Sequence, residues 1–207
     1  MAAAKDSDVK GVDFSMNKKI KVLLVEDDND FVFLIQKMIE GDERLEYVGY
    51  AGCKHLGVEM AQKNKPDVIV MDLNLSGSEL DGIEAAKEIR LTTDAKVLLL
   101  TSFEQPDIVL SACKKAFASG YIFKSQCSTL ADTIYMTATS RTPQGLLIKE
   151  LVLNDLTSAE RGVLKELIEG NPVTASASST IANQKTSIFK KLGIRNTGTA
   201  IRVFKNW

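Results

Sequence analysis

Residues 66–84 read PDVIVMDLNLSGSELDGIE. Four apolar residues, Val68–Met71, follow a Pro-Asp pair and end at a single acid, Asp72. A short apolar run between turn residues and a helical pattern predicts a buried strand of a parallel sheet. Asp72 is therefore expected at the carboxyl end of a strand, after a segment too apolar to end in a charge without a role.

Three more apolar runs end in polar residues in the same way. Glu26 and Asp27 close the first run of the chain, Thr101 closes the run after Asp72, and Lys124 closes the last. In an open α/β sheet, ligands bind in the crevice outside the carboxyl ends of the strands. The spacing therefore predicts one site with three carboxylates, a hydroxyl and an ammonium, a set that suits magnesium-dependent phosphoryl transfer.

Strand and helix patterns alternate regularly along the first 140 residues. The strands are expected at residues 21–25, 47–51, 68–72, 96–101 and 120–124, and the helices at 30–40, 56–64, 82–91, 107–119 and 129–140. This alternation predicts an α/β fold in which five parallel strands form a doubly wound sheet with helices on both faces.

The composition suits a globular protein with one or two domains. The chain has 207 residues, of which 44% are apolar and 26% are charged. No stretch approaches the ~18 apolar residues that cross a membrane. Residues 1–17 lack the apolar core of a secretory signal and are expected to form a flexible polar leader. Cys53, Cys113 and Cys127 show no disulfide or metal-ligand spacing, which favours the reducing cytoplasm.

Charge divides unevenly along the chain. Residues 155–207 hold 8 Lys and Arg against 4 Asp and Glu, a net charge of +4. Residues 1–154 hold 18 against 23, a net charge of −5. An acidic N-terminal part and a basic C-terminal part are typical of an ion-binding domain joined to a domain that contacts nucleic acid.

Four motifs resemble the receiver domain of two-component response regulators. They are VLLVEDD at residues 22–28, the segment around Asp72 quoted above, VLLLTSF at 97–103 and GYIFKS at 120–125. The resemblance implies a flavodoxin-like phosphoacceptor domain at residues 18–140. It also implies that a separate sensor histidine kinase donates the phosphoryl group from a phosphohistidine.

The acids of the site suit a magnesium ion. A hard cation takes oxygen ligands in an octahedron and keeps several waters, so it needs few protein oxygens. Asp27 and Asp72 are expected to bind Mg²⁺ directly, the backbone carbonyl of Asn74 to be a third ligand, and Glu26 to act through a water. The bound cation would offset the repulsion among the carboxylates.

Asp72 is the expected phosphoacceptor, a nucleophile that forms an acyl phosphate. Lys124 is expected to pair with one phosphoryl oxygen, while the Thr101 hydroxyl bonds another. The resemblance also implies a switch in which Thr101 moves toward the phosphoryl group and Tyr121 fills the space it leaves. An ordinary core position is the alternative for Tyr121. The chain modifies its own aspartate and is not expected to be a free-standing enzyme.

Two positions depart from the pattern of the family. The segment 75–80 has Ser76 where proline is usual, and it forms a longer loop. Phe117 stands where glycine is usual, so the turn into the last strand is expected to lack its left-handed residue.

Residues 155–207 resemble the LuxR-type helix-turn-helix of the NarL/FixJ class, joined by a linker at residues 141–154. LTSAERGVLKELIEG at 156–170 contains a capping box made by Thr157 and Glu160. STIANQKTSIFKKLGIRN at 179–196 resembles the recognition helix. The interval NPVTASASS at 171–179 is shorter than the scaffold helix that the family places there, so the output domain is expected to be truncated.

The recognition helix is expected to contact DNA. Two amides suit an adenine edge and four cations suit phosphates; they are Asn183 and Gln184, and Lys185, Lys190, Lys191 and Arg195. An ordinary solvated helix face is the alternative.

Two functions stay open at this point. The first is a response regulator that forms a homodimer when phosphorylated and controls DNA binding and transcription. The second is a receiver whose degenerate output domain acts through protein contacts or dimerisation. A free-standing phosphatase is disfavoured, because Asp72-Leu73-Asn74 lacks the second acid of a DxD motif.

Overall fold

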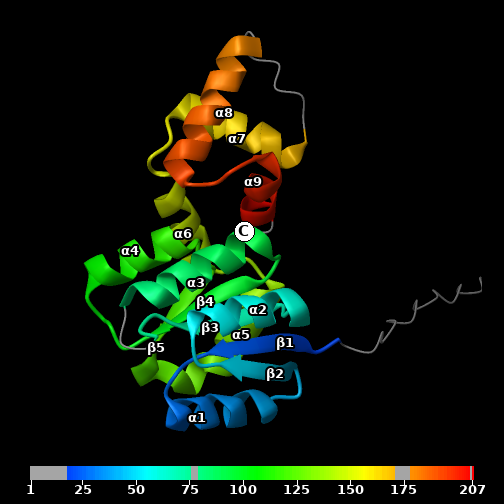
Figure 1. Ribbon diagram of the computed structural model, residues 1–207, viewed down its shortest axis with the longest axis vertical. Helices are drawn as coiled ribbons and strands as arrows, with labels where there is room; N and C mark the ends of the chain where they lie inside the picture. Colours follow the sequence, from blue (N-terminus) through cyan, green and yellow to red (C-terminus); the bar gives the residue numbers. More distant parts are fainter. Residues whose placement is uncertain (1–17, 76–78, 171–177, 206) are drawn as a thin grey trace, which may run out of the picture.

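The computed structural model describes residues 18–75, 79–170, 178–205 and 207. Within this part of the chain, five parallel strands form one sheet in the order β2-β1-β3-β4-β5 (Figure 1). All five lie within two residues of their predicted bounds, which confirms the predicted sheet. They are β1 (Ile20–Val25), β2 (Leu45–Ala51), β3 (Val68–Asp72), β4 (Lys96–Thr101) and β5 (Gly120–Phe123).

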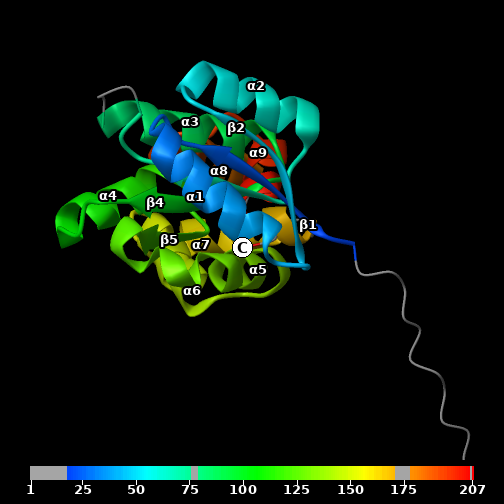
Figure 2. The same cartoon turned by 90° about the horizontal axis from the view of Figure 1, so that it is seen from below.

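Helices cover both faces of the sheet. The pair α1 and α5 packs on one face, and α2, α3 and α4 pack on the other; Figure 2 shows α2 and α5 on opposite sides of β1. These helices are α1 (Asn29–Glu40), α2 (Lys54–Asn64), α3 (Glu79–Thr92), α4 (Pro106–Ala116) and α5 (Leu130–Thr139), the last preceded by a 3₁₀ turn, η1 (Lys124–Thr129).

The strands are apolar throughout because both of their faces are covered. In β1, Val22 and Leu24 lie in the core beneath α1 and α5, whereas Leu23 and Val25 lie in the core beneath the other three helices. Successive side chains of a strand point to opposite faces, so a doubly covered strand needs an unbroken apolar run. A polar residue is then tolerated only where the strand ends, which is where the predicted site residues stand.

The expected linker contains a packed helix, α6 (Pro143–Leu153). Pro143 occupies its first turn, and the Thr142 hydroxyl accepts the Gly145 N–H at 3.0 Å. Its buried residues include Ile148 and Val152, and the helix contacts α4 and β5. The connection between the two halves of the chain is therefore a fixed part of the structure rather than an extended tether.

Among the described residues, three helices follow α6 and lie at the far end of the molecule from β2 (Figure 1). They are α7 (Ser158–Glu169), α8 (Ser178–Leu192) and α9 (Thr197–Phe204). The predicted capping box of Thr157 and Glu160 is present. None of the helices in the described ranges is both long and apolar enough to cross a membrane. The expected leader, Ser76 in its longer loop and most of the interval 171–179 lie outside the described residues.

Phe117 corrects one expectation. The turn into β5 does have a left-handed residue, and it is Phe117 itself, with φ of 53°. This residue ends α4, so that helix stops at Ala116 rather than at the predicted residue 119. The Phe117 ring is 2% exposed, and its centroid lies 6.1 Å from that of Phe204 and 6.5 Å from that of Trp207. Burial of the ring offsets the ~1–2 kcal/mol of backbone strain.

Arg90 joins the sheet domain to the C-terminal helices. Its side chain is 4% exposed, and the guanidinium donates to the carbonyls of Ala95 at 3.1 Å, Phe117 at 3.0 Å and Val203 at 2.9 Å. The guanidinium carbon also lies 5.6 Å from the centroid of the Trp207 ring. Burial lowers the pKa of Arg90 to about 10, so the group stays charged at neutral pH. One buried cation thus connects α3, α4 and α9.

Replacing Arg90 by Met removes three charge-assisted hydrogen bonds from buried carbonyls. Bonds of this kind contribute ~1.5–3 kcal/mol each and are not additive, so we expect Arg90→Met to lower the free energy of unfolding by about 3 kcal/mol in urea titration. Arg161→Met is the control, because Arg161 pairs with Glu150 at the surface and its loss is expected to change stability by about 0.5 kcal/mol or less. Equal losses in the two variants would contradict the structural role of Arg90.

Candidate functional site

The polar residues predicted to form a site all lie at the carboxyl edge of the sheet. β3 ends at Asp72 and β4 ends at Thr101, while Glu26 and Asp27 follow β1 and Lys124 follows β5. Because β1, β3 and β4 are neighbours and β5 pairs with β4, these strand ends converge. The convergence is a direct consequence of parallel strands whose apolar runs end together.

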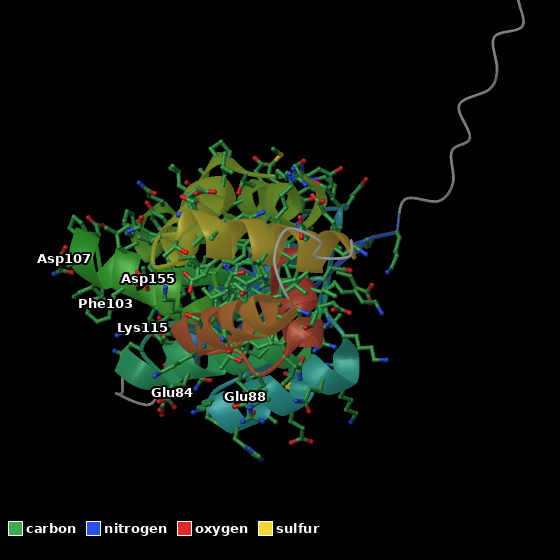
Figure 3. The ribbon with its side chains drawn as sticks, turned by 90° about the horizontal axis from the view of Figure 1, so that it is seen from above. Glu84, Glu88, Phe103, Asp107, Lys115 and Asp155 are labelled. Atoms are coloured by element: carbon green, nitrogen blue, oxygen red, sulfur yellow. The ribbon has the colours of Figure 1, made fainter. Side chains whose placement is uncertain are left out.

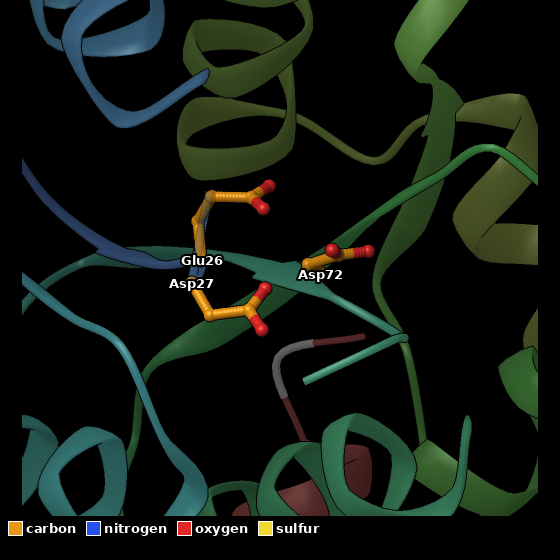
Figure 4. Close-up of side chains that lie close together, drawn as sticks. All are labelled: Glu26, Asp27 and Asp72. Atoms are coloured by element: carbon orange, nitrogen blue, oxygen red, sulfur yellow. The ribbon is translucent and has the colours of Figure 1, made fainter. Parts of the chain in front are cut away.

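Three carboxylates share a small volume at this edge. One oxygen from each of Glu26, Asp27 and Asp72 lies within 4.8 Å of the others. Figure 4 shows the carboxylates of Glu26 and Asp27 extending toward the side on which Asp72 lies. Glu26 is fully buried and Asp72 is 4% exposed, whereas Asp27 is exposed. Closely spaced oxygens from two chain segments, with one side open to water, fit a hard divalent cation.

Lys124 lies between two of these acids. Its ammonium nitrogen forms an ion pair with Glu26 Oε2 at 2.7 Å and donates a hydrogen bond to Asp72 Oδ2 at 2.9 Å. The same nitrogen lies 4.5 Å from the centroid of the Phe31 ring, and the Lys124 side chain is 17% exposed. The structure therefore places a fixed positive charge against the predicted phosphoacceptor.

The protonation of the pair follows from burial and charge. Burial raises the pKa of Glu26 above its ordinary value, the Asp72 charge adds to the increase, and Lys124 opposes it. For Lys124, burial works to lower the pKa, but the bonds to Glu26 and Asp72 raise it above its ordinary value. The ammonium is thus charged at neutral pH and available to an anion bound beside Asp72.

Asn74 and Thr101 lie close to the acids but make their own local contacts. The Asn74 backbone N–H donates to Asp72 Oδ1 at 3.3 Å, and the residue is exposed. Thr101 is 1% exposed, and its hydroxyl oxygen accepts the Phe103 N–H at 3.0 Å. The roles predicted for the Asn74 carbonyl and the Thr101 hydroxyl stay predictions.

Tyr121 has a contact that the sequence did not indicate. Its ring is half-buried, with a centroid 5.6 Å from that of Phe123. Its backbone N–H donates to the Gln144 side-chain oxygen at 3.2 Å. β5 is an edge strand, and an N–H on its outer side lacks a neighbouring strand to bind. Gln144 lies 23 residues further along, in α6, so no local sequence pattern points to it.

The residues predicted to contact DNA lie on α8 or just after it. Asn183, Lys190 and Arg195 are exposed, whereas Gln184 and Lys185 are half-buried. In Figure 1, α8 lies at the end of the molecule away from the sheet. The end of α8 does approach the sheet domain, because Lys190 and Lys191 line a cavity together with Lys87 and Lys114 of the receiver.

Lys191 differs from the other predicted contacts because a carboxylate balances its charge. Its ammonium lies 2.7 Å from Glu160 Oε2, and the Ser187 hydroxyl donates to the other oxygen of Glu160 at 2.6 Å. Lys191 and Ser187 together lower the pKa of Glu160 to about 2. These bonds fix α8 against the start of α7.

Ion pairs also join the C-terminal helices to the sheet domain. Asp155, just before α7, lies beside α4 (Figure 3) and pairs with Lys114 at 2.8 Å. Arg202 of α9 pairs with Asp94 at 3.3 Å and donates to the Leu91 carbonyl at 3.1 Å. The loop after α3 and the end of α4 are therefore the surfaces on which these helices rest.

Comparison with known proteins gives the class of this chain. Residues 22–135 match the family model of the response regulator receiver domain. The chain belongs to the receiver-domain family of response regulators.

Relatives of the same class match nearly the whole chain. A nitrate/nitrite response regulator protein homolog of Haemophilus influenzae is 28% identical over 206 residues, covering 91% of this chain and 98% of its own. The transcriptional regulatory protein DesR of Bacillus subtilis is 28% identical over 194 residues, covering 88% of this chain and 94% of its own. The response regulator RcsB of Salmonella typhimurium has a solved structure with a TM-score of 0.52 and 26% identity, covering 90% and 97%. The predicted class is confirmed.

The acid cluster predicts that Mg²⁺ stabilises the fold and that Asp27 is needed for it. At ten times the dissociation constant, a ligand that binds only the folded state adds about 1.4 kcal/mol, which raises Tm. We expect Asp27→Asn to lose most of this gain in thermal unfolding with and without Mg²⁺.

Asp28→Asn is the matched control, because this substitution changes the net charge by the same amount. The Asp28 side chain lies outside the acid cluster and caps α1 by accepting the Asp30 and Phe31 N–H groups. Asparagine caps helices as well as aspartate does. If Mg²⁺ raised the Tm of the Asp27→Asn variant as much as that of the control, the result would argue against the cluster as the metal site.

Proposed function

We propose that this chain is a cytoplasmic response regulator that accepts a phosphoryl group on Asp72 and thereby controls DNA binding and transcription. The observation that supports it best is the Lys124 ammonium 2.9 Å from Asp72 Oδ2, within a cluster of three carboxylates at the sheet edge. Family membership agrees, and the three cysteines are free, as in a reducing compartment.

The reaction we propose is an in-line transfer from a phosphohistidine of a sensor histidine kinase. A carboxylate oxygen of Asp72 attacks phosphorus, the phosphorus–nitrogen bond breaks, and the imidazole leaves with the electron pair. Charge on the group in transfer spreads over three equatorial oxygens. Lys124 pairs with one of them and the Thr101 hydroxyl donates to another. The contact of the Lys124 ammonium with Asp72 supports this role.

The residues present fit a magnesium ion as the cofactor. Asp27, Asp72 and the Asn74 carbonyl would hold it, with Glu26 acting through a water. Bound there, Mg²⁺ would neutralise charge on the attacking carboxylate and on the phosphoryl oxygens. The separation of at most 4.8 Å between carboxylate oxygens supports this ligand set.

The response we propose begins at Thr101. The Thr101 hydroxyl gives up the hydrogen bond that it accepts from the Phe103 N–H and donates one to a phosphoryl oxygen. The Tyr121 ring then moves into the space that Thr101 leaves. Tyr121 is bonded to Gln144 of α6, so the change reaches the helix that connects the receiver at residues 18–140 to the output domain at residues 155–207. We propose that homodimer formation follows.

The DNA-binding role is supported by relatives and by charge. DesR is named as a transcriptional regulatory protein, and the RcsB structure is described as one of conformational dynamism for DNA interaction. In this chain, Lys190 and Arg195 are exposed near the end of α8, and residues 155–207 carry a net charge of +4. A basic, exposed helix is suited to phosphate contacts.

Asp72→Asn is expected to abolish phosphoryl incorporation from acetyl phosphate and Mg²⁺, because an amide is not a nucleophile at phosphorus. Intact-protein mass spectrometry measures the added group, and hydroxylamine lability identifies it as an acyl phosphate. Asp28→Asn, which removes a neighbouring acid outside the cluster, is expected to label normally. Undiminished labelling of the Asp72 variant would place the acceptor elsewhere.

Binding to duplex DNA is expected to weaken with salt and to strengthen with beryllofluoride, an acyl-phosphate mimic. The slope of log K against log salt is about −0.9 per neutralised phosphate, so Lys190→Gln and Arg195→Gln should each reduce its magnitude by about 1. Lys165→Gln, on α7 with a 74% exposed side chain, is the control. If neither Lys190→Gln nor Arg195→Gln changed the slope, the result would favour an output domain that acts through protein contacts.

A further inference from the structure

A cavity of about 390 Å³ lies at the opposite edge of the sheet from Asp72. Lys96 at the start of β4 and Ser119 just before β5 line its floor, α6 lines one wall, and Trp207 lines another. Three parts of the molecule therefore meet around it: the receiver, the connecting helix and the final described residue. A volume of this order suits a small organic molecule.

One buried polar group at the edge of this cavity has no partner among the described residues. The indole N–H of Trp207 is buried without an acceptor. Trp207 Cδ1, which is bonded to the indole nitrogen, lies 3.9 Å from the position of a Cβ on Gly145, at the cavity wall. Buried polar groups are normally paired, so an unpartnered N–H beside a cavity points to a polar ligand.

The charge of the lining selects an anion. Lys96, Arg141 and Lys149 line the cavity, whereas no Asp or Glu side chain of the described residues does. None of the three cations forms an ion pair within the described part of the chain. The Lys96 ammonium donates to the carbonyls of Thr137 at 2.7 Å and Ala138 at 3.3 Å. An ammonium has three donors, so one remains. The start of α6 is at the same cavity, and its helix dipole also favours negative charge there.

Apolar groups complete the lining. The Trp207 ring, Pro143 and Leu146 contribute carbon surface, and Leu146 is 61% exposed. We propose that this cavity binds a small organic carboxylate with an apolar body, held by Lys96, Arg141 and Lys149 and by the Trp207 indole N–H. Its carboxylate pairs with the cations, and its body packs on the indole.

This site is separate from the phosphoacceptor and would supply a second input. A ligand that binds only when Trp207 and α6 are docked on the receiver stabilises that arrangement by mass action. Trp207 is packed beside Phe204 of α9, with ring centroids 5.4 Å apart, so the ligand would favour the docked position of the C-terminal helices.

The test uses the full chain and its only tryptophan, Trp207. Benzoate is titrated while the Trp207 fluorescence and the indole N–H resonance are recorded. Benzyl alcohol, which has the same ring without the charge, and inorganic phosphate, which has the charge without the ring, are the matched probes. We expect a saturable shift with benzoate, at most a weak one with phosphate and none with benzyl alcohol.

The double variant Arg141→Gln/Lys149→Gln is expected to weaken benzoate binding at least about fivefold, since two cations of the lining are lost. Both side chains reach the surface, so the fold tolerates the change. Lys165→Gln on α7 is the control and should bind as the natural chain does. No saturable shift with benzoate would mean that water alone fills the cavity, and an equal response to benzyl alcohol, or unchanged affinity in the double variant, would equally overturn the proposal.

Discussion

Repulsion among three carboxylates is the constraint on which the site depends. At separations of up to 4.8 Å, two such charges repel by roughly 3 to 4 kcal/mol at an effective dielectric constant of 20. Lys124 offsets part of this by contacting Glu26 and Asp72 together. A phosphoryl group on Asp72 would carry roughly −1.5 to −2 charges in place of the single charge of the carboxylate. Its oxygens would also lie further from the Asp72 backbone than the carboxylate oxygens do, so the ammonium could not keep all of its present contacts. If Asp72 is the phosphoacceptor, as proposed, adding the phosphoryl group would redistribute the contacts of Lys124.

The place of Lys124 in the chain would allow it to transmit such a change. It directly follows β5, and the other end of that strand is held by α6 through Gln144. Just before β5, Phe117 ends α4 and packs on Phe204 and Trp207. A strand four residues long thus has the charged site at one end and the C-terminal helices at the other. This is an unbroken series of packed contacts, and such a series can carry coupling between two sites.

The residues of the sheet edge were predictable because they depend on local patterns. Apolar runs set the strands, and parallel topology brings the ends of those strands together, so Asp72 and Lys124 follow from the sequence alone. The contacts of Arg90 and Gln144 could not be predicted, since their partners lie up to 113 residues away in the sequence. Contacts at such separations leave no periodic pattern in the sequence. The expectation at Phe117 was wrong for a related reason. Left-handed backbone disfavours a bulky residue, but tertiary packing of its ring outweighs that local preference.

The contacts that dock the C-terminal helices differ greatly in strength. The ion pairs of Lys114 with Asp155 and of Arg202 with Asp94 lie at the surface, and such pairs contribute about 0–1 kcal/mol each. The stronger interactions are the buried ones around Arg90 and Phe117, at the end of α4.

This distribution decides how phosphorylation can act on the output helices. Asn183 and Lys190 of α8 are exposed in the docked arrangement, so docking does not bury these two residues. A change in β5 would instead act on the buried cluster at Phe117, where a small displacement removes well-packed contacts. Regulation through this interface would alter the position of α8 relative to the receiver, and hence its geometry in a dimer, rather than uncover a hidden surface.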